Sequence, residues 1–162
     1  MLSFRENRAL HYLLAATGVA MGLSAYHPAM VFDWWLENLL VFLMLGFLAI
    51  TYRRLPLSTF AYGMIFLFLL VHEWGAHHKY ADVPLGEWMK GWLHTTRNHY
   101  DRVSHFSFGF FLSVPMREVF VGTTGHRGGW SYFVPVEFAL AAGAVYEIIE
   151  SIVAEIVTPE QG

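Results

Sequence analysis

Five long apolar segments, separated by shorter polar ones, run through this chain. They are predicted at about 9–26, 34–52, 57–77, 99–119 and 131–157. About 20 residues of α-helix, rising 1.5 Å each, cross the ~30 Å hydrocarbon layer of a bilayer. The pattern therefore predicts an all-α fold: a single membrane domain over residues 1–162, built as a polytopic bundle of about five transmembrane helices.

The segments between these helices differ in character. The longest, at about 78–98, holds an amphipathic stretch with Trp88, Trp92 and Leu93. We expect it to lie on the outer membrane surface, because tryptophan prefers the depth of the lipid headgroups. The segment 121–130 contains four glycines and is expected to form a flexible cytoplasmic turn. It lacks the Lys-Ser or Lys-Thr that completes a phosphate-binding loop, which excludes that class of nucleotide site.

Composition supports the membrane class and excludes several others. Of the 162 residues, 56% are hydrophobic and 14% are charged, against about 25% charged in soluble domains. The net charge of −3 gives no reason to expect nucleic acid as a partner. The absence of cysteine excludes disulfides, thiolate ligands, Fe–S clusters and covalent c-type haem. No clear signal-peptidase site follows the N-terminus, so the first helix is expected to be retained.

Basic residues favour a cytoplasmic N-terminus. In that orientation the inside segments hold six Lys or Arg and the outside segments four, the asymmetry typical of bacterial membrane proteins. The clearest signal is the pair Arg53-Arg54, because the loop before Pro56 is very short. The inside residues are Arg5, Arg8, Arg53, Arg54, Arg117 and Arg127, and the outside residues are Lys79, Lys90, Arg97 and Arg102.

Ionisable residues gather at one predicted depth, near the outer ends of the last three long helices. A charge at the bilayer centre costs at least ~2.5–3.5 kcal/mol, so such residues are expected to have partners or a function. They occur in pairs three or four residues apart, a spacing that puts both members on one helix face. The candidate metal ligands are Glu73, His77, Asp101, His105, Glu147 and Glu150.

These residue types point to metal chemistry. Carboxylate and imidazole at such spacings recur in metal sites inside helical bundles, and they suit a divalent Zn, Mn or Fe ion. A bound metal could lower the pKa of a water and supply hydroxide for hydrolysis. His72 and His99 are candidate general bases or supports for the ligands. Arg97 and Arg102 could hold an anionic headgroup or a phosphate.

The run His72-Glu73-Trp74-Gly75-Ala76-His77 is one residue longer than the His-Glu-x-x-His motif of zinc proteases. Its two histidines are about 140° apart on an ideal helix, at 100° per residue. Both cannot bind one ion unless the helix is distorted, for which Gly75 would be the place. The spacing therefore disfavours the zinc-protease interpretation.

Several runs carry a resemblance to a known family. They are His72–Tyr80, Val83–Gly86, Arg97–Phe106, Gly109-Phe110, Arg117-Glu118 and Tyr146–Glu150. On these residues the chain resembles the YjdF/DUF2238 family of bacterial inner-membrane proteins. The element Asp101-Arg102-x-x-His105-Phe106 also has a weaker similarity to VanZ-like membrane proteins.

The resemblance implies a multi-pass protein of the bacterial inner (plasma) membrane and supplies no established reaction. Family members continue after the fifth helix into a Gly-Thr-Gln-Gly-Asp-x-Trp-Asp segment and a further helix. This sequence reads Thr158–Gly162 at that point, so any ligands in the further segment stay unassigned.

Three functions remain open. The first is a metal-dependent hydrolase acting on a lipid-linked or envelope substrate. The second is a structural or accessory subunit of a membrane complex, in which Glu147 and Glu150 pair with Arg97 or Arg102. The third is a b-type haem protein with two histidines from different helices. Transport has little support, because five helices without an evident repeat give no basis for alternating access.

Local roles compete with these functional ones. Asn98 could cap the fourth helix, and Asp101 at its third position would interact favourably with the helix N-terminus. His105 lies a turn deeper, where capping does not explain it. Asp33 and Glu37 lie at the outer start of the second helix, which they could cap. They are lesser candidates for the group of ionisable residues near the outer ends of the helices.

Overall fold

The computed structural model describes residues 4–157, and that part of the chain is helical without any strand. Residues 158–162, where the sequence departs from the expected family pattern, lie outside the described residues. The α-helices are α1 (Arg8–Ala25), α2 (Val31–Thr51), α3 (Thr59–His78), α4 (Pro84–Leu93), α5 (Tyr100–Thr124) and α6 (Trp130–Val157), and the short 3₁₀ helices are η1 (Phe4–Glu6) and η2 (Tyr80–Asp82).

The five predicted long helices are present, each starting and ending within a few residues of its predicted bounds. One boundary was wrong: the turn predicted at 121–130 begins only at Gly125, because α5 continues to Thr124. Gly125 adopts a left-handed conformation with φ of 71°, and its N–H donates to the carbonyl of Val121 at 2.9 Å. Glycine takes this conformation without the steric cost that other residues have, which ends the helix there.

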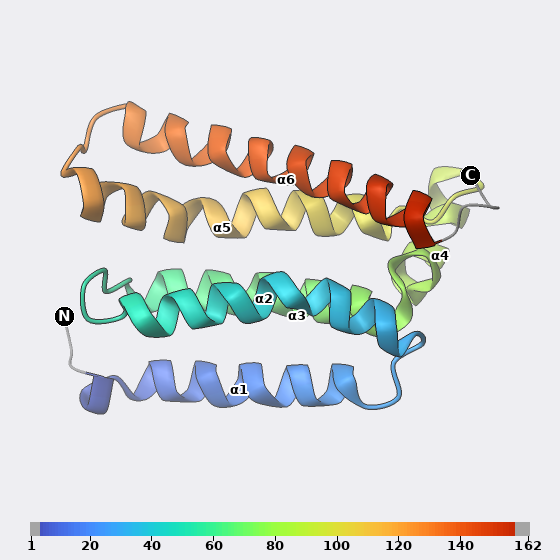
Figure 1. Cartoon of the computed structure of the whole chain (residues 1–162), viewed down its shortest axis with the longest axis horizontal. Helices are drawn as coiled ribbons and strands as arrows, with labels where there is room; N and C mark the ends of the chain where they lie inside the picture. Colours follow the sequence, from blue (N-terminus) through green and yellow to red (C-terminus); the bar gives the residue numbers. More distant parts are fainter. Residues whose placement is uncertain (1–3, 158–162) are drawn as a thin grey trace.

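The long helices form three layers (Figure 1). Helix α1 forms one outer layer, α2 and α3 form the middle one, and α5 with α6 form the other. The central element is α3, which packs against both α1 and α5, whereas α6 packs chiefly on α5. Many of the large apolar side chains of α6 are exposed.

The core follows one stripe of α3. Ala61, Ile65, Phe68 and Leu69 recur at helical spacing and are buried. This spacing presents one apolar face to the neighbouring helices. The face packs with Val41 of α2, Leu57 before α3, and Leu112 of α5, which together make the main hydrophobic cluster.

A polar contact joins the start of α3 to α5. The carboxylate of Glu118 accepts hydrogen bonds from the backbone N–H and the hydroxyl of Ser58, both at 2.6 Å. The Ser58 hydroxyl in turn accepts from the N–H of Ala61 at 3.1 Å, so Ser58 caps the first turn of α3. This contact joins the later part of α5 to the start of α3. The ionisable residues Asp101 and His105 lie near the other end of α5.

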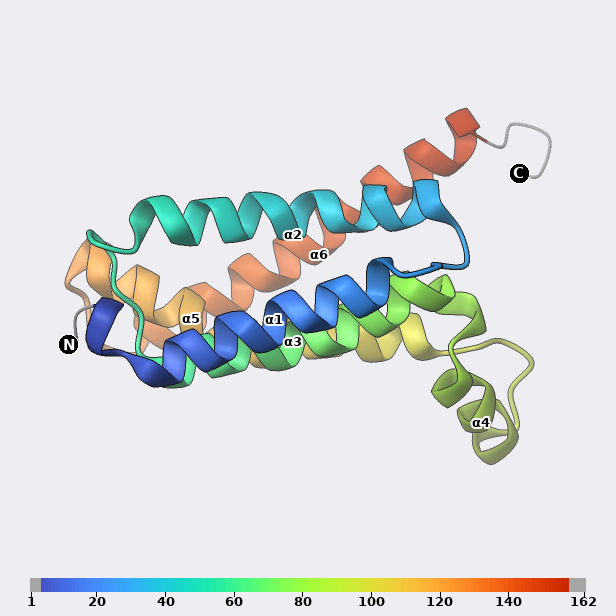
Figure 2. The ribbon, with the colours of Figure 1, turned by 90° about the horizontal axis from the view of Figure 1, so that it is seen from below.

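The amphipathic stretch predicted between the third and fourth long helices is α4, which projects from one end of the bundle (Figure 2). The rings of Trp88 and Trp92 stack on each other at 6.2 Å between centroids and are more than 60% exposed. On the opposite side of α4, the amide of Asn98 donates to the carbonyl of Val83 and to Glu87. Lys90 and Asn98 hold the pKa of the Glu87 carboxyl below its usual value.

Asn98 requires glycine at position 86. A Cβ atom on Gly86 would collide with the Asn98 side chain, so no other residue allows α4 to approach this closely. Asn98 is buried and also accepts from the N–H of Tyr100 at 3.0 Å, which starts α5. Our expectation that Asn98 itself is the N-cap was one residue off, since that position is His99.

Two of the helices, α2 and α3, are long and apolar enough to cross a bilayer when judged by length and composition. They have 21 and 20 residues, respectively. A polytopic bundle of five spans is therefore a proposal.

Leu69→Ala tests the packing that organises the bundle. Leu69 is 1% exposed at the centre of the main cluster, so the truncation leaves a cavity and should cost about 2–5 kcal/mol. The measurement is thermal unfolding of detergent-purified protein. The matched control is Leu70→Ala on the same helix, where the side chain is 41% exposed. Equal destabilisation by the two variants would contradict the packing described.

Candidate functional site

The alternating directions of the helices bring polar residues together at one end of the bundle. The ends of α3 and α6 and the starts of α2 and α5 all lie at the end from which α4 projects (Figure 1). The predicted coincidence of depth is therefore present in the fold. Which of these residues meet depends on how each helix is rotated about its axis.

The centre of the site is His105 on α5. Its Nδ1 lies 3.2 Å from Asp101 Oδ1 and 3.1 Å from the Asp101 carbonyl oxygen, one turn earlier. Its Nε2 lies 3.4 Å from Glu147 Oε1 on α6. The ring thus bridges two carboxylates and links two helices. The side chain of His105 is 30% exposed, and that of Glu147 is 60% exposed.

These three side chains could hold a metal ion. Each offers one ligand atom, and these atoms lie within 4.8 Å of one another. The sequence predicted Asp101 and His105 on one face and Glu147 at the same depth, and the structure brings all three together. Glu150, the fourth predicted ligand of this group, lines the adjoining cavity.

A cavity of about 210 Å³ extends from this cluster into the bundle. Four helices and η2 line it, with polar side chains at one end and apolar side chains at the other. The polar residues are Glu37, His72, Tyr80, Asp101, Ser104, His105, Tyr146 and Glu150; the apolar ones are Leu40, Val41, Met44, Phe68, Phe108, Leu112, Ala142 and Gly143. No lysine or arginine is among the lining residues.

Glu37 and Tyr146 have a larger part in the candidate site than the sequence suggested. The Tyr146 hydroxyl donates to Glu37 Oε2 at 2.7 Å, which joins α6 to α2 across the cavity. Glu37 was a lesser candidate, and Tyr146 was named only within the run that carries the family resemblance. A signal was available, because Tyr146 lies four residues before Glu150 and so shares its helix face.

His72 lies on the cavity wall and is buried. Its Nδ1 is 2.8 Å from the Tyr80 hydroxyl, whereas its Nε2 has no hydrogen-bond partner. Tyr80 approaches because residue 75 is glycine: a Cβ there would collide with the Tyr80 ring. Gly75 therefore admits a neighbouring side chain, and α3 continues as an α-helix through it to His78.

Glu73 and His77 share a face, as predicted, but that face is turned toward α1 and away from the His105 cluster. His77 Nδ1 contacts the Ser24 carbonyl oxygen at 2.9 Å, and the Ser24 hydroxyl donates to the backbone carbonyl of Glu73. Both carboxyl oxygens of Glu73 are buried without a partner. The nearby polar side chains are those of Ser24, Trp34 and Asn38. The two predicted ligands thus lie outside the cavity.

The remaining predicted residues lie around the start of α5 and are not among the residues that line the cavity. Arg97 and Arg102 are exposed, and His99 is half-buried with its Nδ1 unpartnered. Within residues 4–157, the ion pairs of the structure join Glu87 with Lys90 and His105 with Asp101 and Glu147. The arginine–glutamate layer considered for an accessory subunit is not among them.

Tyr146→Phe tests the bond that joins α2 and α6. The change leaves Glu37 without its donor, and we expect a loss of about 1–2 kcal/mol in the free energy of unfolding. Thermal or denaturant unfolding in detergent measures it. Tyr132→Phe is the control. Tyr132 contacts Arg117 through its ring, whose centroid lies 4.1 Å from the guanidinium carbon, and the substitution keeps that ring. Unchanged stability of Tyr146→Phe would show that the bond does not hold the helices together.

Comparison with known proteins gives a family and one curated relative. The model of the family described as "Predicted membrane protein (DUF2238)" matches residues 9–162. The chain is also 35% identical over 130 residues to the inner membrane protein YjdF of Escherichia coli (strain K12). That match covers 80% of this chain and 61% of the relative, so this chain spans about three fifths of that protein's length. No solved structure matches.

Proposed function

This chain belongs to the DUF2238 family of predicted membrane proteins, and from that premise we propose a polytopic protein with a metal-dependent hydrolytic site. The proposal has two parts. The five long helices span the bacterial inner membrane with the N-terminus in the cytoplasm. The cluster around His105 binds a divalent ion near the outer face and acts on a lipid-linked or envelope substrate.

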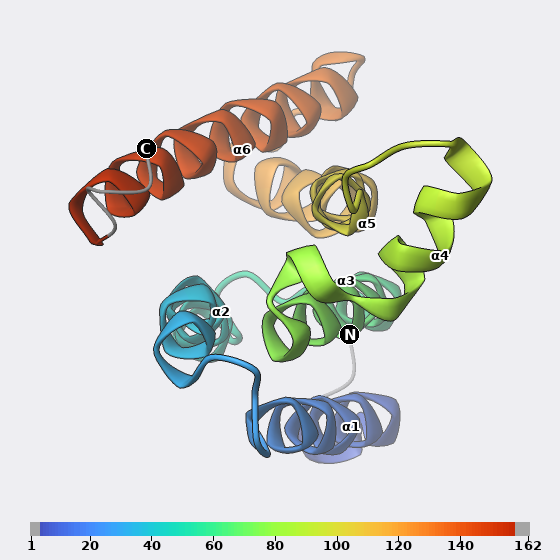
Figure 3. The ribbon, with the colours of Figure 1, turned by 90° about the vertical axis from the view of Figure 1, so that its right-hand side faces the viewer.

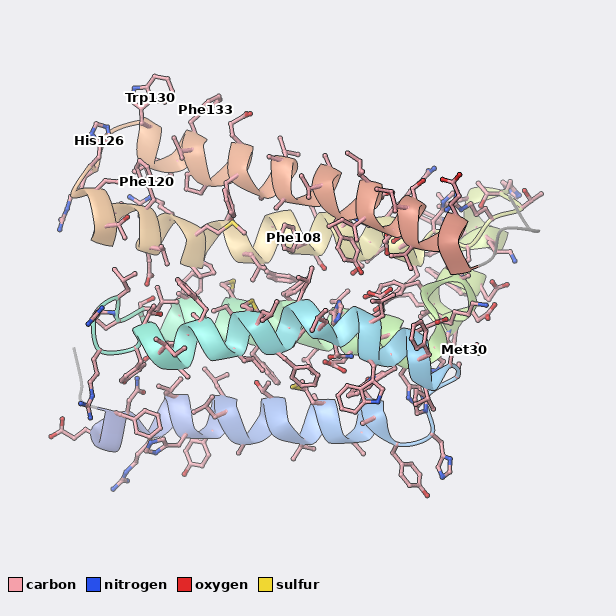
Figure 4. All side chains as sticks on the ribbon, viewed as in Figure 1. Met30, Phe108, Phe120, His126, Trp130 and Phe133 are labelled. Carbon is pink, nitrogen blue, oxygen red and sulfur yellow. The ribbon has the colours of Figure 1, made fainter. Side chains whose placement is uncertain are left out.

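The first part is supported by aromatic residues at both ends of the bundle. Trp88 and Trp92 are exposed on α4, and Trp130 and Phe133 are exposed near the start of α6 at the opposite end (Figure 4). Tryptophan is enriched at both membrane–water interfaces of membrane proteins. The exposed apolar faces of α1, α2 and α6 between these ends would then contact lipid.

The helix boundaries also support the proposed orientation. Arg53 and Arg54 lie in the short connection between α2 and α3, at the same end as Arg117 and the start of α1. The polar cluster and α4 lie at the other end. Since positive residues favour the cytoplasmic side, the site would open toward the outside.

The distance of 3.4 Å between His105 Nε2 and Glu147 Oε1 carries the second part. Two ligands at about 2.0–2.1 Å from a tetrahedral zinc ion lie about 3.3 Å apart. Asp101 lies against the other ring nitrogen, the position in which a carboxylate orients a metal-binding histidine and fixes its tautomer. We therefore assign His105 and Glu147 as ligands, with Asp101 as a ligand or as the residue that orients His105.

The other cavity residues suit hydrolysis. A metal ion with few protein ligands keeps positions for water, and it lowers the pKa of that water. Glu150 lines the cavity and could complete the ligand set or accept the proton of the water. The unpartnered Nε2 of His72 could hold the substrate or act as base. Arg97 and Arg102 are exposed around the start of α5 and could attract an anionic group outside the cavity. Zinc, manganese and iron all accept these ligands.

A second function rests on the same contacts. A protonated His105 between two carboxylates would form an ion-pair cluster that joins α5 to α6 without any metal. Intramembrane charges commonly pair in this way. The protein would then be a structural or accessory subunit of a membrane complex. The haem alternative predicts a Soret band in the absorption spectrum of the purified protein.

Metal analysis with matched variants distinguishes the two functions. The metal-stripped protein is titrated with Zn²⁺ and assayed by competition with a chromophoric chelator. We expect stoichiometric binding by the wild type and a loss of binding in Glu147→Gln and His105→Ala, which remove ligands. Asp101→Asn should weaken binding about 10–100-fold, as substitutions of residues that orient metal ligands do.

Glu137→Gln is the control for this experiment, because Glu137 is exposed on the same helix as Glu147 and lies outside the cavity. It should bind Zn²⁺ like the wild type. A wild-type protein that binds no Zn²⁺, Mn²⁺ or Fe²⁺ would overturn the metal site. A stoichiometric protein partner in native mass spectrometry of the same metal-free sample would then favour the accessory subunit.

A further inference from the structure

The cavity is flanked by two helices that pack little against each other. Helix α2 packs on α3, and α6 packs on α5. Seen along the bundle, α6 runs obliquely, and its later part lies on the side of the α3–α5 pair where α2 lies (Figure 3). Among their residues that face the cavity, Leu40 of α2 is nevertheless 51% exposed. A side chain that both lines the cavity and is half exposed indicates an opening between α2 and α6 at the level of Leu40.

Gly143 widens this opening from the α6 side. It lines the cavity, and a Cβ built on it would meet no atom within 4 Å. No neighbouring side chain fills the space. We call the boundary between α2 and α6 the seam. The Tyr146–Glu37 hydrogen bond lies one turn further along α6, toward the polar end of the cavity, and joins the two helices across this seam. The open part of the seam thus coincides with the apolar half of the cavity.

The two halves of the cavity differ in what they could bind. The apolar half is lined by Val41, Met44, Phe68, Phe108 and Leu112, and Phe108 lies near the middle of the bundle (Figure 4). Such a lining suits a hydrocarbon chain. The polar half is rich in carboxyl groups and without a lysine or arginine. Carboxylates accept hydrogen bonds from hydroxyl groups, and they repel a phosphate.

We propose that this cavity takes up a membrane amphiphile, whose hydrocarbon chain enters from the bilayer between α2 and α6 and whose hydroxyl-bearing headgroup lies against the carboxyl end. The proposal deepens the proposed function, on which it rests, by naming the route and the chemical class of the substrate. The headgroup would reach the His105 cluster, while the chain occupies the apolar half.

Photolabelling in a bilayer tests the route. The protein is reconstituted into phosphatidylcholine nanodiscs that contain a diacylglycerol with a diazirine in one acyl chain. After irradiation, mass spectrometry maps the labelled residues. We expect labels on cavity residues of both flanking helices, such as Leu40, Met44 and Ala142. Labels confined to the outer faces of the helices would overturn the proposal.

Gly143→Leu gives the sharpest comparison, since the added side chain occupies the opening without meeting a neighbour. It should lower labelling of the cavity residues by about tenfold, the effect of about 1.4 kcal/mol on affinity. Gly46→Leu is the matched control: Gly46 lies on α2, is exposed, has open space at its Cβ and is outside the cavity. Its labelling should equal that of the wild type. Equal labelling of Gly143→Leu and wild type would contradict entry by this route.

Two further arms use the wild-type protein and so do not depend on the folding of a variant. Unlabelled diacylglycerol should compete with the probe, and a phosphatidic acid with the same diazirine chain should label the cavity less. Stronger labelling by the phosphatidic acid would overturn the hydroxyl headgroup. Both arms are run with the metal removed by a chelator. Cavity labelling of the metal-free protein supports uptake of the amphiphile even if the protein binds no metal. If the cavity is not labelled in any of these experiments, the uptake proposal is wrong, whereas the metal site is not tested by that result.

Discussion

The position of His105 between Asp101 and Glu147 is the contact on which the rest of the site depends. One ring nitrogen lies 3.2 Å from a carboxylate of its own helix, and the other lies 3.4 Å from a carboxylate of the next. This contact joins α5 to α6 and places the polar end of the cavity. Charged groups in apolar surroundings are tolerated when they have partners. The arrangement satisfies that requirement either as an ion-pair cluster or as a metal site.

The apolar core explains why this contact forms at one end of the bundle. Helix α3 packs between α1 and α5, and Ser58 and Glu118 join its far end to α5. These contacts leave α2 and α6 packed little against each other. A cavity with a polar and an apolar end results, open toward the region that lipid would occupy. A site for a soluble ligand needs no such side opening, whereas an amphiphile from the bilayer does.

Much of the fold follows from the pattern of apolar residues, since helix length and turn chemistry are local properties. The Asp101–His105 pair follows from its spacing for the same reason. The direction in which each pair faces does not, because helix rotation is set by packing. On α3, Phe68 and His72 line the cavity, and Glu73 is therefore turned toward α1. The spacing of Tyr146 and Glu150 puts Tyr146 on the polar face of α6, but its contact with Glu37 of α2 depends on how the bundle assembles.

The metal site is tested most directly by an experimental density map of the zinc-loaded protein, with anomalous scattering data collected at the zinc edge. We expect one anomalous peak between His105 Nε2 and Glu147 Oε1, at about 2.0–2.2 Å from both atoms. Asp101 should remain against the other nitrogen or join the ligands. A His105 ring in direct contact with both carboxylates, with no anomalous peak between the helices, would contradict the metal site and leave the ion-pair cluster.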